Sequence, residues 1–492
     1  MNAQLALAIL AGYFLILILF GRATAKGSDP SSFFTGNKRS PWYIVAFGMI
    51  GASLSGITFI SVPGMVAKDQ WHYFQMVIGY LPGYLIIAYV LLPIYYKLDV
   101  VSIYEYFGKR FGHHSHLTGS FFFLLSRLIG ASFRLFLIAG VLQYVLFEPL
   151  GLPFWSSVAT TILLIWIYTS KAGIKTVVWT DTLQTALMLV GLVITIVIIK
   201  NSLGIDLKPL IDDVVDDPKS EVFNWDWRSA TFFPKQFIAG AFIAITMTGM
   251  DQDMMQKNLT CPNLRSAQKN VVSMSLCLLV INLFFLFLGV LLYKFADVND
   301  IPLPAKSDQL FQVIALDHLG VIGGVIFLLG ITSAAYSSAD SALTSLTTSF
   351  CVDFLKMDKG NFKARNRDKI IVHLGFSLAL FAVINVFYFI NDDSVINSIF
   401  KVATYTYGPL LGLFTFGICS KRNLMDKLVP YVCLLGPFIS YFIHKNSTLI
   451  FFGYQIGFEL LLINGGITIL GLMMISKKNS LKAKDSIQPK KV

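Results

Sequence analysis

The sequence has little charge and lacks the common nucleotide-binding and metal-binding signatures. Asp, Glu, Lys and Arg make up 14% of its 492 residues, whereas soluble globular chains carry about 25%. This shortage argues against a soluble protein. The chain contains no C-x-x-C or H-E-x-x-H pattern and no G-x-x-x-x-G-K-[ST] loop. The sequence therefore predicts neither a zinc or haem site nor an ATP-driven pump with its own nucleotide site.

Long apolar runs are abundant instead. Hydrophobic residues make up 55% of the chain, the mean hydropathy is +0.67, and apolar runs of roughly 20 residues recur along its length, which is typical of a polytopic membrane protein. The first run, AQLALAILAGYFLILILFG, is too long for the core of a signal peptide and lacks a basic segment before it. We predict thirteen spans, at 3–21, 42–66, 74–96, 118–147, 154–170, 177–200, 233–256, 272–296, 319–350, 370–390, 396–418, 428–444 and 449–475.

The positive charges of the predicted loops alternate along the chain. Loops after odd-numbered spans, with the C-terminal tail, hold 27 Lys or Arg, whereas those after even-numbered spans hold 6. The positive-inside rule then places the N-terminus outside and the C-terminus in the cytoplasm of a cell membrane. The net charge of +11 thus reflects membrane topology, and we expect no nucleic-acid partner. This topology places no cysteine in an outside loop and predicts no disulfide: Cys261, Cys277, Cys351, Cys419 and Cys433.

The second predicted span is rich in helix-weakening residues. Its core, GMIGASLSGITFISVPGMVA, runs from Gly48 to Ala67 and distributes Gly, Ser and Pro around the whole helix. Gly and Pro weaken the helical hydrogen bonding, and carbonyls released in this way can bind a cation. Close helix packing through small residues is the alternative, but it explains such residues on one face only. We therefore predict a broken helix here.

The ninth predicted span contains an unusual number of hydroxyl groups. Its inner half reads ITSAAYSSADSALTSLTTSF, 331–350. On a helix, four hydroxyls form one stripe, and hydroxyl oxygens are ligands for hard cations. Alternatively, they bond back to carbonyls of their own helix. Asp340 favours the cation interpretation, because a buried carboxylate needs a cation or a donor. The stripe comprises Ser337, Ser341, Thr344 and Thr348.

Charged residues inside other predicted spans leave two questions open. Asp181 in the sixth span is expected at a depth similar to that of Asp340 and Ser341. These residues form either a cation site or an ion pair with an arginine. Arg127 and Arg134, seven residues apart in the fourth span, share a helix face. Each either anchors an anionic substrate through its guanidinium, pairs with one of the carboxylates, or extends toward the membrane interface.

Five motifs in order resemble the sodium:solute symporter family. They are SGITFISVPG, WTDTLQ, GMDQDMMQKNL, AAYSSADSALTS and YTYGPLLGLF, spread over about 360 residues. The resemblance implies an all-α, LeuT-like inverted repeat of five plus five helices, with the first helix of each repeat discontinuous. The implied organisation is a first span and loop at 1–41, repeats at 42–200 and 233–420, an acidic outside loop at 201–232, peripheral spans at 421–475, and a basic tail at 476–492.

The resemblance also implies the binding residues. A shared sodium site would use carbonyls of Gly51, Leu54 and Ala334 and the hydroxyls of Ser337 and Ser338. Some family members hold a second sodium, which would involve Asp181, Ser337, Asp340 and Ser341, although Asp340 stands where a small polar residue is expected. Substrate candidates are Ser53, Ser55 and Thr58, similar to the hydroxyl set of sialic acid members, with Gln75, Arg127 and Arg134 on the facing wall.

The expected function is sodium-coupled import of a small organic solute by alternating access. The solute would be a sugar, a sialic acid or another organic anion. Met247 stands near the position of the gating tyrosine of sugar members, which argues against a galactose-like site. We expect a monomer in the lipid bilayer, with sodium as coupling ion and no cofactor. The alternatives are a proton-coupled carrier in which Asp340 or Asp181 titrates, and a channel or sensor. A membrane enzyme is the least supported, because no nucleophile–base constellation is visible.

Overall fold

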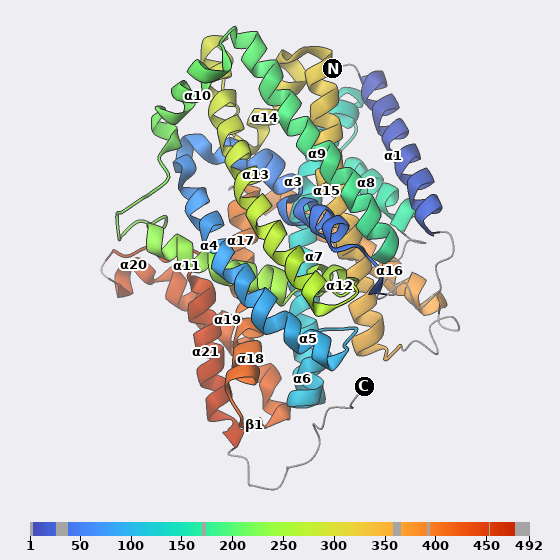
Figure 1. The fold of residues 1–492 in the computed structure, drawn as a ribbon, viewed down its shortest axis with the longest axis vertical. Helices are drawn as coiled ribbons and strands as arrows, with labels where there is room; N and C mark the ends of the chain where they lie inside the picture. The colour runs from blue at the N-terminus through green and yellow to red at the C-terminus, as the bar shows by residue number, and fades with distance from the viewer. Residues whose placement is uncertain are drawn as a thin grey trace.

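The computed structural model describes residues 3–25, 38–169, 174–357, 366–390, 394–451 and 453–477. Most of the predicted 22–41 loop and of the basic 476–492 tail lies outside these ranges. Helices dominate the described chain, and the colour gradient in Figure 1 shows early and late helices packed side by side in one bundle. A short antiparallel ribbon pairs β1 (Asn423–Leu424) with β2 (Ser476–Lys477).

The helices follow the predicted order of spans. The first half contains α1 (Ala3–Ala25), α3 (Trp42–Asp69), α4 (Tyr73–Ile86), α5 (Leu92–Leu98), α6 (Glu105–Arg110), α7 (His113–Leu142), α8 (Phe154–Thr169), α9 (Ile174–Leu203) and α10 (Leu207–Val215). The second half contains α11 (Phe233–Ala244), α12 (Gln252–Asn258), α13 (Leu264–Val298), α14 (Leu310–Val313), α15 (Gly320–Ser349), α16 (Asn366–Ile390), α17 (Val395–Thr406), α18 (Gly408–Cys419), α19 (Val429–Lys445), α20 (Ser447–Ile450) and α21 (Leu460–Met474).

The described helices confirm a polytopic membrane protein but not the predicted number of thirteen spans. Eight helical stretches of the described chain are long and apolar enough to cross a membrane, or nine with the bent pair α17 and α18. One stretch, Trp42–Leu98, is 57 residues long and includes two predicted spans. The last predicted span was placed too early, because its helix begins at Leu460 rather than near residue 449. The count of thirteen stays a prediction.

The second predicted span, α3, lies at the centre of the bundle. It packs against α9, α13 and α15, and α9 and α15 also pack against each other. Nearly every residue of α3 from Val45 to Val66 is buried, as expected for a helix without a polar face. Figure 1 shows α3 among these helices. The central position explains the small residues of its sequence, since small side chains allow neighbouring helices to approach closely.

Both helices that the resemblance predicted to be discontinuous are interrupted. In α3, Ser55 adopts φ 56° and ψ 178°, a conformation that costs a non-glycine residue about 1–3 kcal/mol. The backbone N–H of Ile57 donates to Ser55 Oγ at 3.4 Å, whereas in a continuous helix it would donate to the carbonyl of Ser53. The second interruption separates α11 from α12, where a π-helical turn ends and Asp251 is extended at φ −104° and ψ 123°.

Glycines set the distance between α4 and α11. A Cβ atom at Gly79 or Gly83 would collide with the backbone carbonyl of Phe237 or Ala241 on α11. Gly240 of α11 faces the carbonyl of Met76 in the same way. Only glycine permits such a close approach of two backbones. This contact fixes the position of α11 and therefore of the interruption that follows it.

Asp426, in the connection before α19, caps the N-terminus of α7. Its carboxylate accepts hydrogen bonds from the backbone N–H groups of His114 and Ser115, each at 2.8 Å, and from Ser115 Oγ at 2.6 Å. Burial alone would raise the pKa of Asp426, but the hydrogen bonds from Ser115 and His114 hold the pKa below its usual value. The carboxylate therefore stabilises the fold at neutral pH, and its contribution is lost as the pH falls through its folded pKa.

We expect Asp426→Asn to lower the stability of the purified protein by about 1 kcal/mol, because the amide keeps only one acceptor oxygen and loses the negative charge that faces the N-terminus of α7. The measurement is the melting temperature at pH 7, which should fall. Asp99→Asn is the control, because the Asp99 side chain is 74% exposed. Equal melting temperatures for Asp426→Asn and the parent protein would contradict this role.

Candidate functional site

A small internal cavity lies beside the interruption in α3. Its volume is about 80 Å³, and its walls come from α3, α4, α7, α11, α13 and α17. It brings together five predicted substrate residues from two spans. Aromatic and polar side chains complete the lining, among them Tyr73, Tyr80, Tyr84, Met247, Thr248 and Asn282. The predicted residues present are Ser53, Ser55, Thr58, Arg127 and Arg134.

Gln75 lies outside the lining of this cavity. Its amide nitrogen donates to the carbonyls of His72 and Thr231 at 3.1 and 2.9 Å. Its amide oxygen accepts from the backbone N–H of Asn224 at 3.2 Å. The side chain thus links the 201–232 segment to the start of α4. Both its amide nitrogen and its amide oxygen are hydrogen-bonded there.

The two arginines of α7 have different surroundings. The guanidinium of Arg127 pairs with Asp253 and lies 3.8 Å from an oxygen of Asp251. The side chain of Arg134 is 8% exposed, and its Nε and Nη1 atoms have no hydrogen-bond partner among the described residues. Burial of an unpaired cation is costly. Of the three alternatives for these arginines, Arg127 fits the ion pair, although its partner is Asp253 rather than Asp181 or Asp340. Arg134 fits the anchor of an anion.

The two carboxylates next to the guanidinium of Arg127, those of Asp251 and Asp253, lie at the interruption between α11 and α12. Asp251 Oδ1 accepts from the backbone N–H groups of Asp253 and Met254 at 3.0 and 3.2 Å and so caps α12. Tyr407 donates its hydroxyl to Asp251 Oδ2 at 2.7 Å. Tyr407 lies between α17 and α18, whose axes differ by 45°. The carboxylate therefore joins the α11–α12 interruption to a second bend in the bundle.

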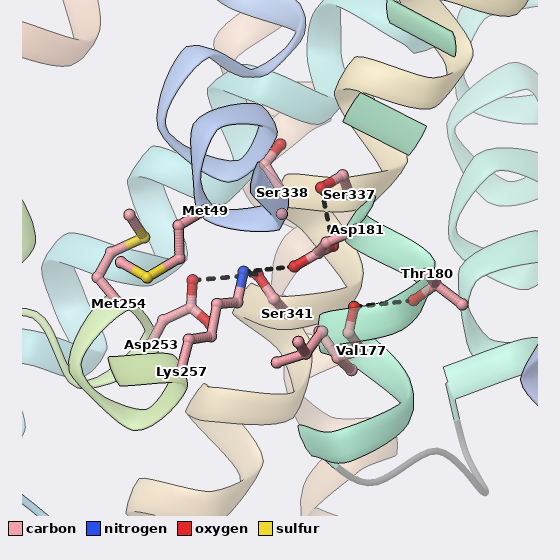
Figure 2. A network of polar contacts seen from close by, with 12 residues as sticks. Met49, Val177, Thr180, Asp181, Asp253, Met254, Lys257, Ser337, Ser338 and Ser341 are labelled. Carbon is pink, nitrogen blue, oxygen red and sulfur yellow. Dashed lines mark hydrogen bonds and ion pairs between the residues drawn. The ribbon is translucent and has the colours of Figure 1, made fainter. Parts of the chain in front are cut away.

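Lys257 of α12 completes a buried polar network with α9 and α15. Its ammonium lies 2.7 Å from Asp181 Oδ2 and 3.1 Å from Ser341 Oγ. Ser337 donates to Asp181 Oδ1 at 2.8 Å, and Ser341 donates to Asp253 Oδ2 at 3.0 Å. Figure 2 shows these five side chains converging from three helices. Each of them is at most 1% exposed.

The residues predicted for the shared sodium site come from α3 and α15, which pack against each other. Ser338 is fully buried and donates to the carbonyl of Ala335 at 3.0 Å, a bond that leaves the lone pairs of its oxygen available for a cation. A Cβ atom at Gly56 would lie 3.2 Å from the Cβ of Ala335, so the two backbones are close. Leu54 immediately precedes the interruption at Ser55, and Ala334 and Ser337 lie on the same segment of α15 as Ser338. Gly51 packs against Thr185 of α9.

Sequence reasoning assigned no role to Asp251, Asp253, Lys257 or Tyr407, although all four lie in the quoted motifs. The predicted span 233–256 places Lys257 in the following loop, whereas the structure buries it in α12. A usable signal was present, since two carboxylates two residues apart follow an apolar run and need cationic partners. Asp340 is fully buried on α15, directly before Ser341.

Interrupted helices that meet at a central cavity, together with buried charges, are typical of secondary transporters. The sequence profile of the sodium:solute symporter family matches residues 33–425. The chain belongs to this family, which confirms the resemblance. It is a multi-pass, sodium-coupled symporter and not an enzyme.

Relatives of known function cover most of the chain. The sodium/sialic acid symporter NanT of Aliivibrio fischeri is 25% identical over 453 residues, covering 89% of this chain and 86% of the relative. The sodium/sialic acid symporter SiaT of Proteus mirabilis is 26% identical over 434 residues, covering 84% of each. The human sodium/iodide cotransporter is 24% identical and covers 80% of this chain and 62% of its own.

Solved structures share the fold. The substrate-bound, outward-open structure of a Na⁺-coupled sialic acid symporter superimposes with a TM-score of 0.79 at 21% identity, covering 96% of this chain and 98% of the other. The nucleobase-cation-symport-1 transporter Mhp1, in a closed conformation, gives a TM-score of 0.56 at 12% identity, with 90% of this chain and 93% of the other covered.

Proposed function

We propose that this symporter imports a small organic anion bearing a carboxylate, with sialic acid as the first candidate. The observation that carries the proposal is Arg134, whose buried guanidinium lines the central cavity with two nitrogens that have no hydrogen-bond partner in the described part of the chain. A guanidinium forks to a carboxylate through two parallel hydrogen bonds. The hydroxyls of Ser53 and Thr58, which line the same cavity, suit the hydroxyl groups of such a solute.

Sodium would bind at the junction of α3 and α15. Carbonyls of Gly51, Leu54 and Ala334 and the hydroxyls of Ser337 and Ser338 are our candidate ligands. Oxygen ligands of this kind suit a hard cation. Sodium would then brace α3 against α15 and raise the population of the state with a formed substrate site, which is positive coupling between two ligands.

The organisation of the chain forms part of the proposal. The interrupted helices α3 and α11–α12 would begin two inverted repeats, at 42–200 and 233–420. The segment 201–232 would face the outside and the C-terminus the cytoplasm of a cell membrane, as the loop charges predict. A functional monomer is a further part of the proposal.

The test is uptake by proteoliposomes that contain the purified protein. A panel of labelled sialic acid, short monocarboxylates, iodide, neutral sugars and amino acids is supplied with an inward sodium gradient at equal pH on both sides. We expect uptake of a carboxylate-bearing solute that requires sodium. Uptake of neutral sugars alone would overturn the assignment of an anion, and uptake driven by a pH gradient without sodium would establish proton coupling instead.

We expect Ser338→Ala to raise the sodium concentration for half-maximal uptake about tenfold, because it removes one ligand hydroxyl while the helix remains intact. Ser345→Ala is the matched control, since Ser345 is buried on the same helix and donates to its own turn at Ala342. The measurement is the sodium dependence of uptake at saturating solute. Equal half-saturating concentrations for the two variants would remove Ser338 from the site.

A further inference from the structure

Lys257 extends from the short helix α12 into the interface between α9 and α15. Its side chain is 1% exposed, although a lysine is almost never fully buried unless it is paired. The ammonium contacts Asp181 Oδ2 at 2.7 Å and Ser341 Oγ at 3.1 Å. Figure 2 shows it pointing between the two helices rather than along the surface of α12.

These contacts involve the oxygens that the family resemblance assigned to a second sodium ion. Asp181, Ser337 and Ser341 belong to that predicted set, and Ser337 is hydrogen-bonded to the second carboxylate oxygen of Asp181 at 2.8 Å. A lysine ammonium is a compact single positive charge whose three donors need acceptor oxygens around them. A carboxylate and a hydroxyl supply oxygen atoms to the ammonium, as they would to a sodium ion.

We propose that the ammonium of Lys257 permanently fills this second cation position, so that the protein binds one sodium ion per chain, at the junction of α3 and α15. The inference rests on the proposed sodium coupling and adds its stoichiometry. Lys257 is thus the residue that determines how many coupling ions the site accepts.

The local charges support this assignment. Asp181 is paired with Lys257, and Asp253 with Arg127. The buried Asp340, the fourth member of the predicted set, also acts electrostatically on Lys257. A sodium ion placed on the same oxygens would lie next to the ammonium in a water-excluded region, where repulsion between like charges is poorly screened. Ser341 adds no negative charge to offset this repulsion; its oxygen accepts from Lys257, and its hydroxyl donates to Asp253.

The experiment is equilibrium binding of ²²Na⁺ alone to the purified full-length protein at pH 8.5, measured to saturation. We expect one ion per chain for the wild type and two for Lys257→Met, which keeps the length of the side chain and removes its charge. Two ions bound by the wild type would overturn the inference. No sodium bound by the wild type would instead contradict the proposed sodium coupling.

Two further variants separate a filled cation position from a merely structural ion pair. Lys257→Arg retains the charge and should still bind one ion. The double variant Lys257→Met with Asp181→Asn removes both charges, leaves no carboxylate for a second ion, and should return to one. If the single methionine variant, folded by size-exclusion chromatography, also binds one ion, the inference is wrong. Should that variant not fold, Lys257→Gln carries the same expectation.

Discussion

Replacing Arg134 with methionine should weaken binding of the anionic solute by at least about 100-fold while the protein remains folded. Hydrogen bonds to a charged group contribute about 1.5–3 kcal/mol each, and a forked pair contributes two of them. Without solute, the substitution removes no hydrogen bond of Nε or Nη1, because these Arg134 atoms have no partner among the described residues. Removing a buried cation of this kind should leave the melting temperature equal or higher.

The measurement combines solute binding with thermal unfolding, both in saturating sodium. Arg134→Lys is the matched variant, since it keeps the charge and loses the planar fork; we expect an intermediate affinity. Sodium binding without solute should be unchanged in both variants. A methionine variant that binds the solute as tightly as the wild type would show that the anion is held elsewhere.

Replacing Arg127 with methionine should instead cause a large loss of stability. Arg127 neutralises Asp253 and lies near Asp251, and all three side chains are at most 5% exposed. Removing one member of a buried ion pair costs about 3–5 kcal/mol, because the remaining charge is left without a partner. We expect a strongly lowered melting temperature or failure to purify as a monodisperse protein.

A second substitution tests that explanation. Adding Asp253→Asn to Arg127→Met removes the orphaned charge and should restore part of the lost stability, a non-additive result that a double-mutant cycle measures. Additive losses for the two substitutions would show that they do not act on one another. The contrast between Arg127 and Arg134, seven residues apart on one helix, would then be established by two independent measurements.

The polytopic helical class and the interruption of α3 could be predicted from sequence, because both follow from local composition. Long apolar runs require helices, and Gly, Ser and Pro distributed around residues 48–67 weaken one of them. The motif resemblance predicts Ser53, Ser55 and Thr58 as candidate substrate residues, and the three line one cavity.

The partners of the buried charges could not be predicted in this way. Asp181 and Lys257 are 76 residues apart in the sequence, and their contact depends on α12 turning into the bundle after Asp251. The sequence predicts this lysine in a loop, because it follows the end of an apolar run. The different surroundings of Arg127 and Arg134 could not be predicted either, since the two residues share a helix face and only tertiary packing distinguishes their neighbours.

The ammonium of Lys257 has a consequence for the energy source of the cycle. One sodium ion carried inward with one monovalent carboxylate transfers no net charge. A membrane potential of 100 mV, which supplies about 2.3 kcal/mol for each elementary charge moved across the membrane, would then contribute nothing to uptake. Accumulation would be limited by the ratio of sodium concentrations alone, and import would continue unchanged in a depolarised cell. The lysine side chain buried beside Asp181 would make this an electroneutral carrier.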